Sequence, residues 1–475
     1  MVSNEGNVAI VIGASIAGLL AAQVASKHFD HVVILDQDEL SSPGKTRTFS
    51  PQANHAHLLH HHGGDIIEGF FPGFYDRLME LGSVQIAIED FAWFSHGYWK
   101  HSLRRLKNTH VHYSQMRGFI DQALIGLIQK NSKVTLRESH KVVGYLFDQT
   151  NSRINGVKVR TRGEETEASE FDIPADLVID TSGNSSSTPN LLVQLGYRAP
   201  KVSKVGLDIT YVSQIMSLPQ KNYGWKLLAH TPPAPCKRGF LMIPVSGGRW
   251  LVTQAEVFAA QTPDTHEKFI EFAKSQSLPH LYEIIKDGQP LSTVRRYRFP
   301  GSSWKRYHEV TSLPDGLIAL GDAVLRLNPI YGQGMTASAV SANCLNQCLN
   351  EYYAKDGPRL AGFPHVFFRK MALSQKIAWE LNVREDFRYS RTTGSKPFLL
   401  KTINYYLLKV LELSSQDPHI FETFFAVLNM QLPPRSFFRP YIFKEVIFRL
   451  MGLRKMRPVD SSQIELVNHD ESKVA

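Results

Sequence analysis

Two short runs of apolar and β-branched residues lie near the start of the chain, at Val8–Ile12 and His31–Leu35. Runs of this length and composition are typical of strands that are buried on both faces of a sheet. Between them, a turn of small residues from Gly13 to Gly18 leads into an apolar helix that we expect to end near His28. The pattern therefore predicts a β-α-β unit.

This predicted unit has the residue types that bind the phosphates of a dinucleotide. Gly13 and Gly18 let the backbone approach a pyrophosphate at the helix N-terminus, and Ser15 stands where the strict fingerprint has its second glycine. Asp36 follows the second strand and is placed to accept hydrogen bonds from a ribose hydroxyl. Taken alone, the unit does not distinguish NAD from FAD.

A second apolar run with a glycine-rich loop lies far along the chain, in LIALGDAVLRLNPIYGQGM (residues 317–335). Residues 317–320 read as a buried strand before Asp322, and the loop opens a helix at Met335. The loop contains Pro329, Gly332 and Gly334. A carboxylate at a strand end suits the ribityl and phosphate region of a flavin, and N–H groups at a helix N-terminus suit its reduced ring. The two units together predict FAD.

On these residues the chain resembles the class A flavoprotein monooxygenases, whose second FAD motif is this Gly-Asp pair followed by a proline and two glycines. A third segment, LVIDTSGNSSSTPNLLVQLGY (177–197), resembles the Asp-x-x-Gly motif of the family, with Asp180 and Gly183 as the matching residues. The family has arginine after this glycine, whereas the chain has Asn184. The resemblance therefore does not supply the usual charged contact at this loop.

Within the family, four segments look similar to the squalene-epoxidase-like branch, and most of all to bacterial enzymes that epoxidise polyene chains in polyether biosynthesis. They are residues 51–63, 177–197, 239–255 and 317–335. The resemblance spans residues 5–395. It implies that Arg47 and Arg117 contact the flavin or its phosphates and that Gly332 and Gly334 lie beside the pyrimidine ring, while Gln333 replaces a histidine of some relatives.

The resemblance implies an α/β fold of the p-hydroxybenzoate-hydroxylase type: a Rossmann-like FAD-binding domain, an inserted β-sheet substrate domain and a helical C-terminal region. We expect the FAD-binding domain in residues 1–200 and 311–350, as a mostly parallel sheet with helices on both faces. Residues 201–310 are expected to form the substrate domain and residues 351–457 the helical region. Residues 458–475 are polar, which predicts a flexible tail.

The middle region carries the clearest strand pattern outside the flavin motifs, in residues 206–218 and 239–258. A Ser246-Gly247-Gly248 turn between two apolar runs predicts a hairpin. Phe240 and Met242 share one side of the predicted strand, and with Tyr211 they are candidates to line a substrate cavity. Few ionisable residues interrupt these runs, so a charged aromatic acid would find little to pair with.

The resemblance implies an enzyme in which a flavin hydroperoxide transfers one oxygen atom, with NADPH or NADH as the electron source, directly or through a reductase. The apolar middle region, with further apolar surface from the helical C-terminal region, favours epoxidation of an alkene in an isoprenoid or polyene substrate, in secondary metabolism. Hydroxylation of a phenol is the alternative, and a non-catalytic flavin-fold protein that binds a ligand is the second alternative. No catalytic side chain is assigned, because the cofactor carries the bond-making.

Composition sets the remaining bounds. The chain has 475 residues with 43% hydrophobic residues, enough for a large core in two or three coupled domains. It has 3 cysteines, which fits a reducing, cytoplasmic compartment, and we expect Cys344 and Cys348 to be core residues rather than a redox pair. Neither a secretory signal nor a run of transmembrane length is recognisable, so neither is expected.

Positive charge gathers near the end of the chain. The net charge is +9, and residues 435–457 hold seven Arg or Lys against one acid, Glu445, interleaved with aromatic and aliphatic residues. This segment could be a helix with peripheral contact to an anionic membrane. The interpretation that we favour is a core-packing helix with a solvated basic edge. No nucleic acid partner is expected, because the chain shows no module of the known kinds.

Five histidines lie close together in the sequence, at positions 55, 57, 60, 61 and 62. They suggest a metal site, but no matching cluster of cysteines or carboxylates lies nearby in the sequence. We therefore expect no metal and assign the histidines to packing and hydrogen bonding. His57 is a candidate to touch the cofactor or the substrate.

Overall fold

The computed structural model of the chain describes residues 6–40, 55–100, 111–162, 170–219, 223–356 and 360–454. Arg47, the tail at 458–475 and the last three residues of the segment 435–457 lie outside these ranges, so the expectations for them stay predictions.

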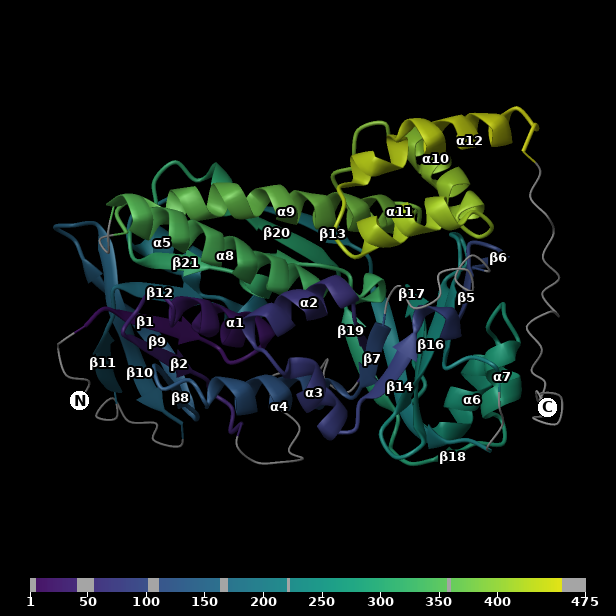
Figure 1. Ribbon diagram of the computed structural model, residues 1–475, viewed down its shortest axis with the longest axis horizontal. Helices are drawn as coiled ribbons and strands as arrows, with labels where there is room; N and C mark the ends of the chain where they lie inside the picture. Colours follow the sequence, from purple (N-terminus) through teal and green to yellow (C-terminus); the bar gives the residue numbers. More distant parts are fainter. Residues whose placement is uncertain are drawn as a thin grey trace.

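The predicted β-α-β unit lies in the middle of a five-stranded parallel sheet with the strand order β21-β12-β1-β2-β8 (Figure 1). Its strands are β1 (Val8–Ile12), β2 (His31–Leu35), β8 (Val134–Arg137), β12 (Leu177–Asp180) and β21 (Leu317–Ala319). The bounds of β1 and β2 are those predicted from the hydrophobic pattern. Because the strands are parallel, their carboxyl ends meet at one edge of the sheet, so Asp36 after β2 and Asp322 after β21 lie along the same edge, with β12 and β1 between their strands.

The two faces of this sheet are covered differently. Alternate residues of a strand point to opposite faces, and Ala9 and Val11 pack on a helical layer. This layer contains α1 (Ile16–Ala25), α4 (Arg117–Ile128) and α8 (Gly334–Asp356). On the other face, Ile10 and Val33 pack on Ile154 of an antiparallel sheet. Its strands are β9 (His140–Asp148), β10 (Arg153–Thr161) and β11 (Glu170–Pro174). The expectation of helices on both faces was therefore wrong, because apolar residues of β10 cover the second face.

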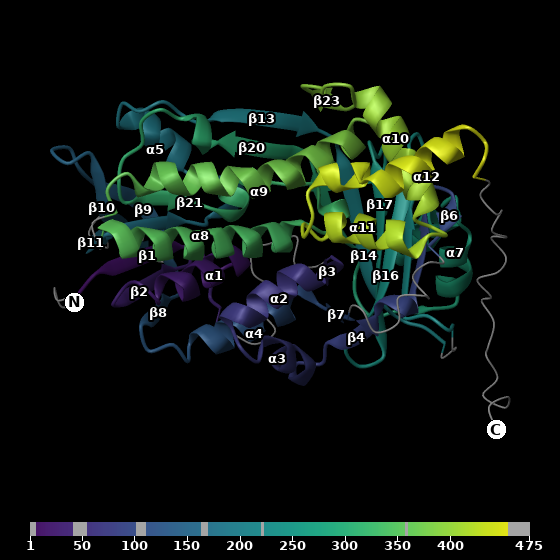
Figure 2. The same ribbon diagram turned by 45° about the horizontal axis from the view of Figure 1, so that its top comes forward.

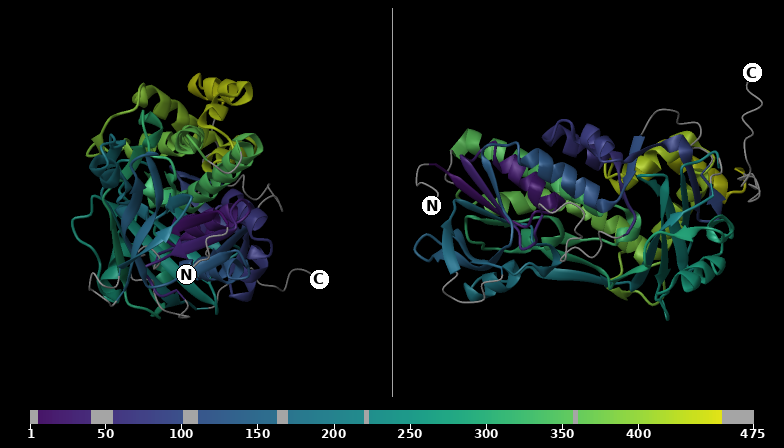
Figure 3. Two further views of the ribbon diagram at one scale, coloured as in Figure 1. Left: turned by 90° about the vertical axis from the view of Figure 1, so that its left-hand side faces the viewer. Right: turned by 90° about the horizontal axis from the view of Figure 1, so that it is seen from below.

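A second large sheet occupies the other end of the molecule, in the order β18-β14-β17-β16-β15-β5-β6, with β19 beside β14 (Figure 3). Its strands are β5 (Phe91–Ser95), β6 (Tyr98–Trp99), β14 (Ile209–Ser217), β15 (Leu227–Thr231), β16 (Arg238–Val245), β17 (Arg249–Val257), β18 (Gln289–Pro290) and β19 (Arg295–Phe299). The predicted hairpin is confirmed: β16 and β17 pair antiparallel around the turn, in which Gly247 and Gly248 have φ of +75° and +68°.

The middle sheet is not built from residues 201–310 alone. β5 and β6 come from the segment expected in the FAD-binding domain, and β5 pairs in parallel with β15. This pairing joins segments far apart in the sequence, so no local pattern predicts it.

Smaller elements connect the two large sheets. One three-stranded sheet contains β3 (His57–Leu59), β4 (Val84–Ala87) and β7 (Val111–Gln115). A four-stranded sheet contains β13 (Lys201–Gly206), β20 (Ser302–Arg306), β22 (Leu325–Arg326) and β23 (Thr393–Gly394). The short helices are α2 (His61–Phe70), α3 (Phe74–Glu80), α5 (Thr188–Gln194), α6 (His266–Lys274) and α7 (His280–Ile285).

The C-terminal region is helical, as predicted. The long helix α9 (Phe363–Asp386) runs beside α8 (Figure 2). Beyond it, residues 400–450 form what we call the cap, which lies over one end of the middle sheet (Figures 1 and 2). The cap contains α10 (Leu400–Leu413), α11 (Pro418–Leu428), the 3₁₀ helix η10 (Pro434–Phe438) and α12 (Pro440–Leu450). Val410, Ile420 and Val446 give it an apolar cluster of its own. None of the helices in the described ranges combines the length and the hydropathy that a membrane span requires.

Candidate functional site

A cavity of about 1090 Å³ extends from the turn after β1 to the inner side of the cap. A single drug-sized ligand usually occupies roughly 300–1,000 Å³. Most of the residues predicted for the cofactor and the substrate line it: Gly13, Ser15, Asp36, Arg117, Gly183, Asp322, Pro329, Gly332, Gly334, Tyr211 and Phe240. Gly18, Asp180 and Met242 lie behind this lining.

The turn after β1 is shaped by glycines that leave no room for a side chain. Gly13 has φ of +101°, where only glycine is relaxed. A Cβ on Gly18 would lie 1.8 Å from the carbonyl oxygen of Gly13. The Thr181 hydroxyl donates to the carbonyl oxygens of Ile12 and Gly13, at 2.7 and 3.0 Å. Gly18 thus acts through packing, because it allows α1 to approach this turn.

Asp36 holds the same turn from the neighbouring strand. Its Oδ2 accepts a hydrogen bond of 2.6 Å from the backbone N–H of Ala14, and its Oδ1 accepts one of 2.8 Å from Asp38. Asp36 also lines the cavity, so its carboxylate lies where a dinucleotide would place a ribose hydroxyl.

Asp180 organises the loop after β12 rather than facing the cavity. It is fully buried, and its carboxylate accepts hydrogen bonds from the hydroxyls of Ser182, Ser186 and Thr188. The loop then turns at Gly183, with φ of +74°, and Gly183 and Asn184 line the cavity.

Asp322 is a further carboxylate that lines the cavity. Within the described part of the chain, no donor binds its side chain. Burial raises the pKa of Asp322, and the positive charges of Arg326 and Arg117 oppose this shift. Arg117 begins α4 and contacts Asp121 at 3.2 Å, while its buried Nε finds no partner among the described residues. An unsatisfied carboxylate and an unsatisfied guanidinium N–H fit a ligand that has both hydroxyls and phosphates.

The loop before α8 is held by a histidine that sequence analysis did not single out. Gly332 adopts φ of +67°, and a Cβ there would lie 3.1 Å from Nε2 of His60. That nitrogen lies 3.1 Å from the carbonyl oxygen of Tyr331. His60 belongs to the histidine-rich segment, but its role becomes visible only when α8 lies beside α2.

Gln333 joins this loop to the cap. It is 1% exposed, and its Nε2 donates to the carbonyl oxygen of Leu428 in α11 at 2.7 Å. Its Oε1 accepts a hydrogen bond of 2.6 Å from Asn382 in α9. Gln333, which stands where some relatives have a histidine, thus connects the flavin loop to α9 and to α11 of the cap.

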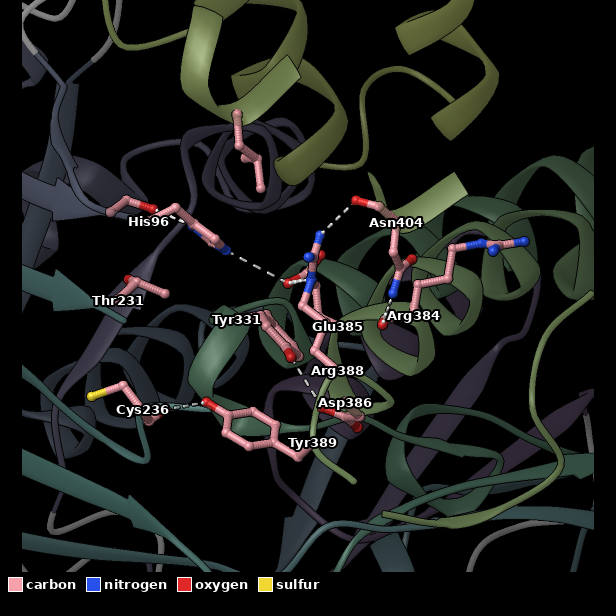
Figure 4. Close-up of polar contacts among 12 residues, drawn as sticks. His96, Thr231, Cys236, Tyr331, Arg384, Glu385, Asp386, Arg388, Tyr389 and Asn404 are labelled. Carbon is pink, nitrogen blue, oxygen red and sulfur yellow. Dashed lines mark hydrogen bonds and ion pairs between the residues drawn. The ribbon is translucent and has the colours of Figure 1, made fainter. Parts of the chain in front are cut away.

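A buried carboxylate lies behind the same loop (Figure 4). Oδ1 of Asp386 accepts hydrogen bonds from Asn328 Nδ2 at 2.8 Å and from the Tyr331 hydroxyl at 3.0 Å. The Tyr211 hydroxyl donates to Asn328 Oδ1 at 3.3 Å. Burial raises the pKa of Asp386 to about 7. Two cavity-lining tyrosines are therefore connected to a carboxyl group that titrates near neutrality.

Figure 4 also shows Glu385, which points away from Asp386 toward His96 of the loop between β5 and β6. Its Oε2 lies 3.9 Å from His96 Nε2 and 2.8 Å from Arg388 Nε. Burial alone would raise the pKa of Glu385, but His96 and Arg388 together lower it. Among the described residues, the one carboxylate that lines this part of the cavity is thus paired with the Arg388 guanidinium.

The part of the cavity next to the middle sheet and the cap is largely apolar. Its lining includes Phe91, Trp93, Leu227, Phe240, Leu241, Leu381, Leu407, Phe424, Phe425, Leu428 and Phe437. Burial lowers the pKa of His55 and of His230 to about 4, so both rings are neutral at neutral pH. Met242 shares one side of β16 with Phe240, as predicted, but it packs in the core with Leu228 and Val252 instead of lining the cavity.

The histidine-rich segment does not converge on one point. His57 lines the cavity, and His55 contacts the Ser213 hydroxyl at 2.8 Å. His61 stacks on Phe425, with ring centroids 5.8 Å apart. Within the described ranges, no three His, Cys, Asp or Glu side chains are grouped so that they could hold a metal. Cys348 is buried in the core beside α1, and Cys344 packs against the same core.

Comparison with known proteins also points to FAD as the cofactor. A family model described as "FAD binding domain" matches residues 5–360. The protein Rv3254 of Mycobacterium tuberculosis is 27% identical over 406 residues, which cover 83% of each chain.

Among solved structures, p-nitrophenol 4-monooxygenase PnpA of Pseudomonas putida superposes with a TM-score of 0.60 at 15% identity, over 90% of this chain and 100% of that one. A flavin-dependent brominase superposes with a TM-score of 0.64 at 12% identity, over 94% of this chain and 99% of that one. At these identities the likeness is one of fold, and it confirms the predicted p-hydroxybenzoate-hydroxylase-type architecture.

Proposed function

Because this chain belongs to the FAD-binding domain family, we propose that it is an FAD-dependent monooxygenase that epoxidises an alkene of a large apolar substrate. The observation that carries this proposal is the composition of the cavity wall. The wall beside the middle sheet and the cap is built mainly from leucine and phenylalanine side chains and Trp93, and its one described carboxylate, Glu385, is paired with Arg388. A long apolar substrate loses no hydrogen bonds there, whereas an unpaired carboxylate would be costly to bury.

The residues around the cofactor have separate tasks in this proposal. The turn at Gly13 and the N-terminus of α1 hold the pyrophosphate, Asp36 binds a ribose, and Arg117 and Asp322 bind the phosphate and ribityl region. The loop of Pro329, Gly332 and Gly334 lies beside the flavin ring. Bound FAD, reduced by NADPH or NADH directly or through a reductase, supplies the activation of dioxygen.

The cap and the middle sheet have the task of excluding water. Phe424, Phe425 and Phe437 close the cavity on the side of the cap. A dry wall protects a reactive oxygen-transfer step from hydrolysis and orients the substrate by shape. The rings of His55 and His230 are neutral, and the carboxylate of Glu385 in the same lining is paired with Arg388.

The experiment is to incubate the purified protein with FAD, a reductant, labelled dioxygen and a mixed panel of polyenes and phenols, and to measure the gain of one labelled oxygen by mass. NADPH or NADH is used alone and then with an added reductase. We expect epoxides of the polyenes. Oxygen gain confined to phenolic rings would reverse the choice of substrate, and a protein that stays colourless after incubation with FAD would favour a non-catalytic flavin-fold binding protein.

Hydroxylation of a phenol is the second candidate, and one observation favours it. Tyr211 and Tyr331 line the cavity and are linked to Asp386, whose pKa burial raises to about 7. A group that titrates near the working pH is suited to accept a phenol proton, whereas an alkene needs no base. Tyr331 donates directly to Asp386, so replacing Tyr331 by Phe would then lower phenol turnover and leave alkene turnover unchanged.

A further inference from the structure

The cap presents large apolar side chains on its outer side, as well as on the inner side that lines the cavity. Phe438, Phe443 and Leu450 are 47%, 48% and 44% exposed. The Tyr406 ring stacks on both Phe438 and Phe443, with centroid distances of 4.7 and 6.2 Å, so the patch is continuous between α10 and α12. We call these residues, together with the exposed side chains of α12, the outer cap surface.

The helix α12 is already anchored in the fold by its opposite side. Ile442 and Val446 are buried in the apolar cluster of the cap. Its exposed positions nevertheless include Tyr441, Phe448 and Leu450. The favoured interpretation of residues 435–457, a core-packing helix with a solvated basic edge, therefore describes one side of α12. The other side is apolar and unlike an ordinary solvated helix face.

Basic residues surround these apolar side chains. Arg435, Arg439 and Lys444 are exposed, and the Lys444 ammonium lies 5.3 Å above the Phe448 ring. Two of the nearby acids are turned inward and paired: Glu445 is 7% exposed and contacts Arg454 at 3.0 Å, and Glu412 contacts Lys409 at 2.7 Å. Glu422 of α11 is exposed and lies 3.7 Å from His419, so three exposed cations face one exposed acid. The outer cap surface thus combines aromatic side chains with uncompensated positive charge.

We propose that the outer cap surface binds the surface of an anionic lipid bilayer. Amphipathic helices with aromatic and aliphatic residues and flanking Lys and Arg lie in the interface plane of such membranes, with the charges at the headgroups. A second copy of the chain fits less well, because a two-fold contact would bring this positive surface against itself. Charge complementarity therefore selects the lipid.

The same elements of the cap line the cavity on one side and carry the outer cap surface on the other. Leu407 and Phe437 line the cavity on the inner side of the same elements that carry Tyr405 and Phe438 on the outer side. A bilayer bound to the outer cap surface would lie one helix layer away from the cavity. The proposal goes beyond oxygen transfer and does not depend on it, since lipid binding is measured without turnover.

The test is flotation of the FAD-loaded full chain with two kinds of vesicle, phosphatidylcholine alone and phosphatidylcholine mixed with phosphatidylglycerol. We expect binding to the mixed vesicles only, and loss of binding at high salt because screening weakens the attraction. Replacing Arg439 and Lys444 by Gln should weaken binding about fivefold for each charge. Replacing Phe443 and Phe448 by Ser should weaken it about tenfold or more.

Leu291→Ser combined with Arg295→Gln is the matched control. Both residues are exposed and lie at the middle sheet, away from the cap, so this variant should bind vesicles like the unchanged chain. Flavin content and melting temperature verify that each variant is folded. Failure of the unchanged chain to float with anionic vesicles would overturn the proposal. So would lipid-free self-association that the Phe443 and Phe448 replacements abolish, because the surface would then be a dimer interface.

Discussion

The flavin end of the cavity is shaped mainly by the backbone, whereas the cap end is shaped by the side chains of helices that come last in the chain. At the flavin end, Gly13 and Gly332 have positive φ, and Gly18 leaves no space for a Cβ beside Gly13. At the cap end, the wall consists of exchangeable apolar side chains such as Leu407 and Phe424. The backbone at the flavin end therefore accommodates a ligand of one shape. At the cap end, substitution of the wall side chains changes which ligand fits.

This difference predicts different responses to mutation. A backbone-shaped site cannot adjust to an added atom, because the atom meets main chain rather than a movable side chain. A wall of apolar side chains loses contact area in proportion to what is removed. The predictions below test this contrast at the flavin end, at the junction of the two ends and in the cap.

The largest effect is expected for Gly18→Ala. The added Cβ would lie 1.8 Å from the carbonyl oxygen of Gly13, so α1 must move away from β1 and the turn must open. Overpacking of this kind costs about 3 kcal/mol or more. We expect a large fall in melting temperature and loss of the yellow colour of the purified protein.

Gly126→Ala is the control for this variant. Gly126 lies within α4, and a Cβ there would meet nothing within 4 Å. Because alanine favours helix over glycine by about 1 kcal/mol, this variant should be at least as stable as the unchanged chain. If Gly18→Ala retained flavin and stability like Gly126→Ala, the turn would not be the rigid element described here.

The second prediction concerns Asp386, where α9 meets the flavin loop. In the folded chain burial raises its pKa to about 7, against about 3.9 in an unfolded chain. Between these values the folded state holds a proton that the unfolded state has lost. Its contribution to stability is therefore full below pH 4 and is lost as the pH rises through 7. Asp386→Asn removes this dependence and keeps an acceptor for Asn328 and Tyr331.

Urea unfolding at pH 5 and pH 8 measures this effect. From the lower to the higher pH, the stability of Asp386→Asn relative to the unchanged chain should rise by about 2–4 kcal/mol. Asp172→Asn, an exposed change on β11, is the control and should follow the unchanged chain. Parallel stability curves for Asp386→Asn and the unchanged chain would show that this carboxyl group titrates normally.

A smaller effect is expected at the flavin end for Asp322→Ala. The carboxylate lines the cavity, and the change removes one or two charge-assisted hydrogen bonds to the cofactor. At about 1.5–3 kcal/mol each, one such bond corresponds to roughly ten- to hundredfold in FAD affinity. Fluorescence titration of the apoprotein with FAD measures this, with Asp172→Ala as the control. Unchanged affinity in a folded variant would mean that Asp322 does not face the flavin.

What the sequence predicted follows the same division. Short apolar runs predict the bounds of β1 and β2. Glycines a few residues apart predict the turn at Gly13 and the loop at Gly332. They could therefore be predicted from the order of residues. Asp180 was predicted to bind the cofactor. In the structure its carboxylate instead accepts hydrogen bonds from hydroxyls of its own loop, and the same motif is compatible with either role.

The cap end could not be predicted in the same way. Asp386 meets Asn328, and Gln333 meets Leu428, only because α9 and α11 fold back over the flavin loop. β5 enters the middle sheet through pairing with β15 across a long stretch of sequence. Contacts between segments so far apart in the sequence cannot be predicted from the spacing of residues within one segment. The apolar character of the substrate wall was predicted from the middle region and from the helical C-terminal region, but the sequence did not show which residues of the cap line the cavity.

The smallest effect is expected for Leu407→Ala in the cap, and it tests whether the cap contacts substrate without influencing the flavin. Leu407 lines the cavity and is half-buried, so its removed atoms would leave a gap beside a bound apolar substrate. Losing this contact should cost about 1 kcal/mol, which is roughly a fivefold fall in kcat/KM carried mainly by KM. FAD affinity should not change.

Leu399→Ala is the matched control, because Leu399 is 53% exposed at the start of the same helix and does not line the cavity. Steady-state kinetics with the best polyene of the panel and FAD titration of both variants decide the matter. A fall in FAD affinity for Leu407→Ala would show that the two ends of the cavity are coupled, since Gln333 connects the flavin loop to α11 through its bond to Leu428.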